Sequence, residues 1–194
     1  MKITYFGHSC FTLQSGGYTV ALDPYDEKVP GYQPLSISAD RVCCSHEHFD
    51  HCYVSAVAIK DSGVKDPFSE TSYLIPHDDE GGAKRGMNKI RVFCAEGRKV
   101  IHFGDTGCMP SDDYLEAFKG ADAIMIPVGG FFTIDPAQAK AIADAIKPRL
   151  LIPMHYRDGS QGLSQIAEIG EFLSLCKDAV YEVRKLNYGE SIEI

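Results

Sequence analysis

The chain has 194 residues, of which 19 are basic and 27 acidic, and its formal net charge is −8 at pH 7. A chain of this length can bury a sizeable core without help from disulfides or metals, and it fits one medium-sized domain, here residues 1–194. The acidic balance disfavours a non-specific nucleic-acid binder, because such a protein needs a basic surface to displace counterions from phosphates.

The first half of the chain reads as short strands joined by turns. Apolar segments bounded by turn residues predict strands at residues 2–7, 10–15, 18–23, 41–45, 68–75, 88–96 and 99–104. Gly16 and Gly17 predict a hairpin turn between the second and third of these strands. Residues 53–60 are expected to form one or two helical turns.

Beyond Asp105 the pattern changes to strands that alternate with helices. Strands are predicted at residues 122–128, 150–154, 180–186 and 191–194, and helices at residues 111–119, 135–147 and 162–176. In the helix over residues 135–147, Asp135 is expected to cap the helix, Pro136 takes its first position, and Gln138 completes a capping box. This order predicts an α/β fold of two sheets with helices outside them.

The seven cysteines point to a reducing environment. They form no Cys-x-x-Cys pair, no secretory leader precedes them, and no apolar run approaches the roughly 20 residues of a membrane span. We therefore expect a soluble, cytoplasmic protein with reduced cysteines and no membrane contact. Most of the cysteines lie in apolar stretches and are expected to be buried and inert, whereas Cys52 and Cys108 lie nearer the histidines described next.

The strongest motif is the segment from Ser45 to His51. It places four residues that can bind a metal within six positions, namely His46, His48, Asp50 and His51. In an extended chain the side chains of residues 46, 48 and 50 would point one way and that of residue 51 another, so one loop could serve two nearby metal ions. Imidazole and carboxylate ligands favour Zn²⁺, with Mn²⁺ or Fe as alternatives, over Ca²⁺ or Mg²⁺.

Further ligands are expected at the ends of other strands. His77, Asp105 and His155 each follow a predicted strand directly. Strand ends that gather at one edge of a sheet are a common place for functional sites. Each of these residues alone has an ordinary structural explanation. Together, and in this order after the histidine-rich loop, they indicate one shared site.

These residues together resemble the motif pattern of the metallo-β-lactamase superfamily. Supporting motifs are Leu22-Asp23-Pro24, Phe6-Gly7-His8-Ser9, His102-x-Gly104-Asp105-Thr106-Gly107, Pro127-Val128-Gly129-Gly130 and Pro153-Met154-His155-Tyr156. The last four are similar to small metal-dependent hydrolases related to the ascorbate-6-phosphate lactonase branch. The resemblance spans residues 2–156, and no motif lies in the remaining residues of the chain.

The resemblance implies a four-layer αββα sandwich, with two mixed sheets and outer helices, that holds two divalent metal ions. His46, His48 and His77 would bind the first ion, Asp50, His51 and His155 the second, and Asp105 would bridge both. A hydroxide shared by the two ions would attack an ester, lactone or phosphoester, with Asp105 and Asp50 as the catalytic carboxylates. Asp23 would orient a ligand.

One ligand has an alternative. Only 26 positions separate His51 from His77, which is short for the superfamily, so His102 is a second candidate for the third histidine. In the strand that leads to Asp105, residues 101, 103 and 105 share a face and His102 points away from it, which favours His77.

Several neighbouring residues have both a structural and a functional interpretation. His8 could meet the substrate or a metal ligand, or be a satisfied structural histidine. Lys84 and Arg85 could hold an anionic group of the substrate, or be solvated residues of a hairpin. Asp78 and Asp79 could orient His77, although turn chemistry is the simpler explanation. Tyr156 could donate a hydrogen bond to an oxyanion.

The expected partner is a small-molecule substrate, which could be anionic, and the sequence leaves homo-oligomer formation open. Three other functions use the same residues. The ligands could hold iron for redox chemistry, although no flavin-binding domain fits within 194 residues. Nuclease activity is disfavoured by the acidic balance. The third of these functions is a non-catalytic metal sensor, and the intact ligand set gives it little support.

Overall fold

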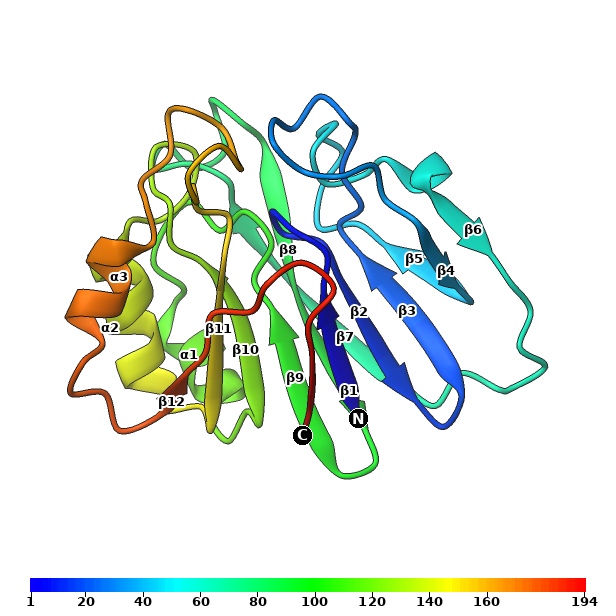
Figure 1. Cartoon of the computed structure of the whole chain (residues 1–194). Coiled ribbons are helices and arrows are strands. Elements are labelled where there is room, and N and C mark those ends of the chain that lie inside the picture. The colour runs from blue at the N-terminus through cyan, green and yellow to red at the C-terminus, as the bar shows by residue number, and fades with distance from the viewer.

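The computed structural model describes residues 1–194, which form two β-sheets packed face to face with three α-helices on one side (Figure 1). The five-stranded sheet has the order β13-β1-β2-β3-β5. Its strands are β1 (Lys2–Tyr5), β2 (Phe11–Ser15), β3 (Tyr18–Leu22), β5 (Arg41–Cys43) and β13 (Ser191–Glu193). All pairs in it are antiparallel except β3 with β5, and the pairing of β1 with β13 brings the two termini side by side.

The six-stranded sheet has the order β12-β11-β10-β9-β8-β7. Its strands are β7 (Ser69–Pro76), β8 (Met87–Ala95), β9 (Arg98–His102), β10 (Ala123–Pro127), β11 (Leu150–Met154) and β12 (Glu182–Val183). The pairs from β7 to β9 are antiparallel and those from β9 to β12 are parallel. The predicted two-sheet α/β fold is confirmed by this arrangement.

The main core lies between the two sheets and under the helices. β1 and β8 alternate buried with more exposed residues over most of their length, because one face of each strand meets the core. β10 and β11 are buried at every position, since helices cover their outer face. The continuous apolar runs of these two strands therefore have a direct structural cause.

Three helices, α1 (Asp112–Phe118), α2 (Pro136–Ile146) and α3 (Gly170–Leu175), lie outside the six-stranded sheet (Figure 1). The predicted capping box of α2 is confirmed. The side chain of Asp135 accepts a hydrogen bond from the Gln138 backbone N–H at 2.7 Å, and the Gln138 side chain accepts one from the Asp135 N–H at 3.0 Å. Pro136 occupies the first turn, as predicted.

The outer face of the five-stranded sheet has no α-helix. It is covered by a two-stranded sheet of β4 (Ile37–Ala39) and β6 (Val57–Ile59) and by the loop that follows β3. A single 3₁₀ turn at Val54–Ala56, which buries no residue, precedes β6. The helical turns predicted for residues 53–60 are thus wrong beyond residue 56. Val57 is buried in the small core on this face, and a strand lets it pack there while the backbone pairs with β4.

The predicted helix over residues 162–176 is shorter than expected, since only Gly170–Leu175 is helical. The preceding segment runs beside the chain after β11, where the Ala167 N–H donates to the Gly129 carbonyl at 2.7 Å and the Arg157 N–H donates to the Ala167 carbonyl at 2.9 Å. These tertiary backbone bonds replace the helical ones. The longest helix, α2, has 11 residues, and none of the helices meets the length and apolarity that a membrane span requires.

Candidate metal centre

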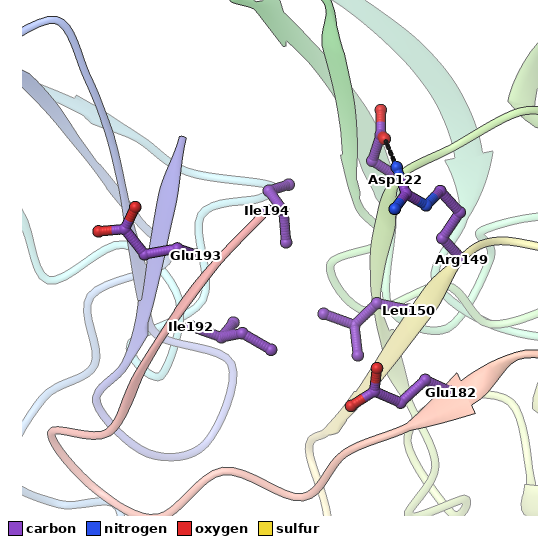
Figure 2. Close-up of a pocket in the computed structure, with 7 residues that line it drawn as sticks. All are labelled: Asp122, Arg149, Leu150, Glu182, Ile192, Glu193 and Ile194. Carbon is purple, nitrogen blue, oxygen red and sulfur yellow. Dashed lines mark hydrogen bonds and ion pairs between the residues drawn. The ribbon is translucent and has the colours of Figure 1, made fainter.

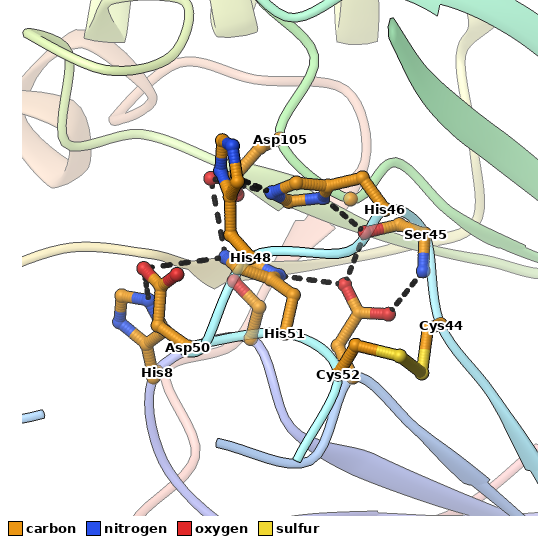
Figure 3. Close-up of polar contacts among 12 residues, drawn as sticks. His8, Cys44, Ser45, His46, His48, Asp50, His51, Cys52 and Asp105 are labelled. Carbon is orange, nitrogen blue, oxygen red and sulfur yellow. Dashed lines mark hydrogen bonds and ion pairs between the residues drawn. A yellow bond between two sulfur atoms is a disulfide. The ribbon is translucent and has the colours of Figure 1, made fainter. Parts of the chain in front are cut away.

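The predicted ligands meet at one edge of the two sheets, although they come from distant parts of the sequence. Figure 3 shows five of them, His46, His48, Asp50, His51 and Asp105. They lie in the segments that follow β5, β7, β9 and β11. Three overlapping groups have donor atoms within 4.8 Å of one another: His46, His48 and His77; His46, His51 and Asp105; and His8, Asp50, His51 and His155. The structure therefore brings together all seven residues predicted as ligands, and His8 with them.

Asp105 lies at the centre of the cluster. Its Oδ2 is 3.1 Å from His51 Nε2 and 3.4 Å from the Nε2 atoms of both His77 and His155. His46 Nε2 is 4.0 Å away. Burial disfavours the charged carboxylate, but the imidazoles of His155 and His51 outweigh burial and hold the pKa of Asp105 well below its usual range. One carboxylate oxygen thus faces the imidazoles of four different histidines.

The first group of histidines is suited to binding a metal in the neutral form. His46 Nε2 and His48 Nδ1 are 3.0 Å apart, and the rings of His46 and His77 lie 4.7 Å apart. Burial, together with nearby His51, lowers the pKa of His46 to about 3. Burial also lowers the pKa of His77. His48 is exposed, so the group opens to solvent on that side.

The second group contains both acidic and basic members. His8 Nε2 is 3.2 Å from Asp50 Oδ2, and His51 Nε2 is 3.7 Å from the same oxygen. The ring of His155 is 4.3 Å from that of His8. Burial opposes a charged imidazole at His51, but Asp105 above all raises the pKa of His51 well above its usual value. A positive charge is therefore favoured at this point, as a divalent cation would supply.

The histidine-rich loop is a turn rather than an extended segment. The backbone N–H groups of His51 and Cys52 both donate to the His48 carbonyl, at 3.0 and 2.9 Å. The expectation that residues 46, 48 and 50 share a direction is therefore wrong for Asp50, whose side chain lies in the second group with His51. The turn reverses the chain between His48 and Asp50 and so divides the loop between two groups of ligands.

Unpartnered atoms in the cluster test whether a metal fits there. Several buried side-chain atoms have no hydrogen-bond partner: His8 Nδ1, His51 Nε2, His77 Nδ1, Asp105 Oδ1, and both ring nitrogens of His155. Buried polar atoms without a partner cost about 1–3 kcal/mol each. Imidazole nitrogens and a carboxylate oxygen are donors that transition-metal ions and Zn²⁺ accept. The residues present therefore fit a bound metal.

Asp23 supports the cluster from behind, where the resemblance implies it should lie. It follows β3 with a φ of 43° and is almost completely buried. Its carboxylate accepts hydrogen bonds from the Ser45 N–H at 2.7 Å and the Ser45 hydroxyl at 2.5 Å, and its Oδ2 lies 2.7 Å from His51 Nδ1. These contacts fix the His51 ring so that its Nε2 faces Asp105.

The His77 turn is held by Asp78. The carboxylate of Asp78 accepts four hydrogen bonds of 2.8–2.9 Å from the backbone N–H groups of Glu80, Gly82, Lys84 and Arg85. This favours the turn-chemistry interpretation of Asp78. Gly107 packs against the same turn, because a Cβ at that position would lie 2.1 Å from the Asp78 backbone nitrogen.

Two other candidates, His102 and Tyr156, lie outside the ligand cluster. His102 is fully buried; its Nε2 donates to the Ser9 carbonyl at 3.0 Å and its Nδ1 accepts from the Gly104 N–H at 3.2 Å. The structure therefore gathers His77, and not His102, among the ligands. Tyr156 lines a separate cavity of about 260 Å³ with Tyr5 and Tyr32.

Asn88 is a supporting residue that sequence reasoning missed. Its Oδ1 accepts from the Asp105 N–H at 2.9 Å and its Nδ2 donates to the Phe103 carbonyl at 2.8 Å. A Cβ at Gly104 would lie 2.2 Å from Asn88 Oδ1, so the glycine is needed for this contact. A single asparagine at a strand start carries no recognisable signal in the sequence.

Two cavities differ in their relation to the cluster. A cavity of about 560 Å³ is lined by His46 and His48 together with the basic residues Arg85, Lys89 and Arg91. A smaller cavity of about 190 Å³ lies near the C-terminus (Figure 2). Its charged residues include Asp122 and Arg149, which pair with each other at 3.2 Å, and no ligand of the cluster lines it. The larger cavity is therefore the candidate substrate site.

Cys44 and Cys52 flank the histidine-rich loop and are joined by a disulfide, with Cα atoms 5.3 Å apart (Figure 3). The expectation of reduced cysteines is wrong for this pair. The sequence signal was weak, because eight positions separate the two residues and only the turn brings them together. The other five, Cys10, Cys43, Cys94, Cys108 and Cys176, are free as expected.

Reducing this disulfide should lower the thermal stability of the metal-free protein. A disulfide that closes so short a loop restricts the unfolded chain and so raises the free energy of unfolding by about 2–3 kcal/mol. This corresponds to roughly 5–10 °C in Tm for a chain of this size. Thermal unfolding with and without a dithiol measures the effect. A variant with both Cys44→Ser and Cys52→Ser should not respond to the dithiol, whereas Cys94→Ser should respond as the wild type does. Equal melting of the wild type under both conditions would contradict the prediction.

Comparison with known proteins shows which family this chain resembles. A family model described as the beta-lactamase superfamily domain matches residues 2–155. A UPF0173 metal-dependent hydrolase of Opitutus terrae is 27% identical over the whole of both chains. A UPF0173 protein of Pyrococcus furiosus is 30% identical, over 80% of this chain and 83% of its own. The crystal structure of a proposed Zn-dependent hydrolase of the metallo-β-lactamase superfamily from Thermotoga maritima superposes with a TM-score of 0.72 at 29% identity, covering 95% of this chain and 97% of that one.

Proposed function

Because this chain belongs to the metallo-β-lactamase superfamily and is a metal-dependent hydrolase, we propose that it holds two divalent metal ions and cleaves an ester, lactone or phosphoester bond. The observation that carries the proposal is the position of Asp105. Its Oδ2 lies within 4.0 Å of histidines from both ligand groups, so one carboxylate can serve two metal positions. The link to the ascorbate-6-phosphate lactonase branch remains a prediction.

The two ligand groups divide the loop between two metal positions. His46, His48 and His77 would hold the first ion, and Asp50, His51 and His155 the second, with Asp105 between them. When bound, such a pair of ions lowers the pKa of water and polarises the bond to be broken. Zn²⁺ is the ion that this mixture of imidazoles and carboxylates favours.

The chain's own residues orient the reacting groups and move the proton. The Asn88 amide oxygen accepts a hydrogen bond from the Asp105 backbone N–H and fixes the backbone there, and the carboxylate of Asp105 lies among the histidines. Asp50 is the proton carrier in this scheme. Its Oδ2 lies 3.2 Å from buried His8, which holds the carboxylate toward the cluster. Ser45 holds the Asp23 carboxylate, and Asp23 in turn keeps the His51 ring in its orientation.

The proposal is tested by metal quantification on protein purified without added metal, followed by assays on lactones, phosphodiesters and thioesters. We expect two ions per chain, and hydrolysis that a chelator abolishes and the metal restores. His48→Ala removes an exposed ligand, so the variant should fold, lose metal and lose activity. Glu47→Ala, its exposed neighbour, is the matched control for metal content. Full metal content and activity in His48→Ala would overturn the proposal, and so would iron with a visible absorption band and no hydrolysis.

A further inference from the structure

Arg85 differs from every other arginine of the chain in its ion pairing. Of the seven arginines, six have a carboxylate oxygen within 4.0 Å: Arg41, Arg91, Arg98, Arg149, Arg157 and Arg184. Arg85 has none, and its guanidinium donates no hydrogen bond. In a protein with 27 acidic residues, an arginine left without a carboxylate beside a catalytic cluster requires an explanation.

The surroundings of Arg85 hold it in place and leave its donors free. Its guanidinium carbon lies 5.5 Å from the centre of the Phe132 ring, within cation–π distance. A guanidinium carries five N–H donors, and with no hydrogen bond or ion pair at the Arg85 side chain they are available for a carboxylate or phosphate. The Arg85 backbone N–H is fixed by Asp78, and four backbone N–H groups already occupy the carboxylate of Asp78.

Arg85 also lines a cavity that two of the proposed metal ligands border. It lines the cavity of about 560 Å³ that His46 and His48 border. It also lines a neighbouring cavity of about 450 Å³ on the side of Phe132. Lys89, which has no carboxylate partner either, lines the first cavity, and its backbone N–H donates to the Ser45 carbonyl at 3.0 Å. Two cations without carboxylate partners thus line the cavity that His46 and His48 border, together with one acidic residue, Glu47.

Adjacent Lys84 shows why the two basic residues of this turn are not equivalent. Lys84 Nζ lies 2.6 Å from Glu80 and 3.7 Å from Asp79, and both acids are exposed. Its charge is therefore balanced within the turn, and it does not line the larger cavity. The sequence places these residues side by side with the same charge, and only the structure separates them.

From these observations we infer that Arg85 binds an anionic group of the substrate, a carboxylate or a phosphate, at a distance from the bond that is cleaved. The inference rests on the proposed function, because it names the substrate class for the same site. The planar fork of the guanidinium can donate two parallel hydrogen bonds to either oxyanion. Lys89, which lines the same cavity, adds positive charge there. The substrate is thus an ester, lactone or phosphoester that carries a second, anionic end.

The first test is calorimetric titration of metal-loaded protein with inorganic phosphate. Arg85→Gln should weaken binding about tenfold, or about 1.4 kcal/mol. Lys84→Gln should change binding less than about twofold, because its charge is already balanced. Arg85→Lys should fall between the wild type and Arg85→Gln. Equal affinities in the wild type and Arg85→Gln, or equal losses in Arg85→Gln and Lys84→Gln, would overturn the inference.

The second test separates the carboxylate from the phosphate and the inference from the proposed function. The substrates are three 4-nitrophenyl esters of matched length, one ending in a carboxylate, one in a phosphonate and one in a methyl group. Arg85→Gln should lower the ratio of kcat/KM for the preferred anionic ester over the neutral ester about tenfold, mainly through KM. Cleavage of all three with an unchanged ratio would overturn the inference alone. Cleavage of none, with the calorimetric difference intact, would contradict ester hydrolysis and leave the anion site standing.

Discussion

Replacing Asp105 by asparagine should reduce kcat/KM by on the order of a thousandfold, or about 4 kcal/mol of transition-state stabilisation, and leave at most one metal ion per chain. The carboxylate oxygen that now lies 3.1–3.4 Å from His51, His77 and His155 would be replaced by a neutral amide. An amide supplies no negative charge between two cations, and its NH₂ end cannot bind a metal. The metal content of the purified variant and its kinetics on the best substrate measure the two effects.

The control for Asp105→Asn is Asp113→Asn, which removes an exposed carboxylate from the first turn of α1. This variant should keep two metal ions and full activity. Circular dichroism of metal-free Asp105→Asn should show the wild-type fold, so that the loss is assigned to the site. A variant that retains two tightly bound ions and near-normal turnover would show that Asp105 does not bridge the metal positions.

The two sheets could be predicted from the sequence because their signals are local. The apolar segments between turn residues in the first half of the chain, the continuous apolar runs at Ala123–Pro127 and Leu150–Met154, and the capping box at Asp135 each require only a few consecutive residues. The two-stranded sheet at Ile37–Ala39 and Val57–Ile59 escaped prediction because each strand has three residues and depends on the other for its hydrogen bonds.

The composition of the candidate site was also predictable, whereas its geometry was not. The spacing of histidines and aspartates identified the residues that the structure gathers. The turn at His48 directs Asp50 to the second group of ligands. The alternation of side chains in an extended strand instead predicts that Asp50 points the same way as His46 and His48, which is wrong. Asn88 and the Cys44–Cys52 bond depend on contacts between residues that the sequence gives no reason to associate.

The local charge of the cavity could not be predicted from the sequence either. The net charge of −8 argued against a non-specific nucleic-acid binder, yet the lining of the larger cavity includes three basic residues and only one acidic residue, Glu47. Arg91 is already paired with Glu70, whereas Arg85 has no carboxylate partner. Composition cannot separate these cases, because pairing is decided by which side chains the fold brings within 4 Å. An acidic protein can therefore present a locally cationic site.

Replacing Asp23 by alanine should destabilise the metal-free protein by about 3 kcal/mol and weaken metal binding about 10–100-fold. The buried carboxylate contacts the Ser45 N–H, the Ser45 hydroxyl and His51 Nδ1 at once, and alanine would leave these groups buried without partners. The His51 ring would then be free to rotate away from Asp105. Chemical unfolding of the metal-free variant and competitive metal titration measure the two effects separately.

Asp40 offers a matched control, because its side chain is also nearly buried and accepts backbone hydrogen bonds from Thr19 and Ser62 at 2.8 Å, but it contacts no ligand of the cluster. Asp40→Ala should destabilise the fold and leave metal affinity unchanged, since its loss acts only through stability. If the two variants lose metal affinity equally, Asp23 acts on the fold in general. If only Asp23→Ala loses it, the aspartate positions His51 for the metal, and the strained backbone at Asp23, with its φ of 43°, is maintained for that purpose.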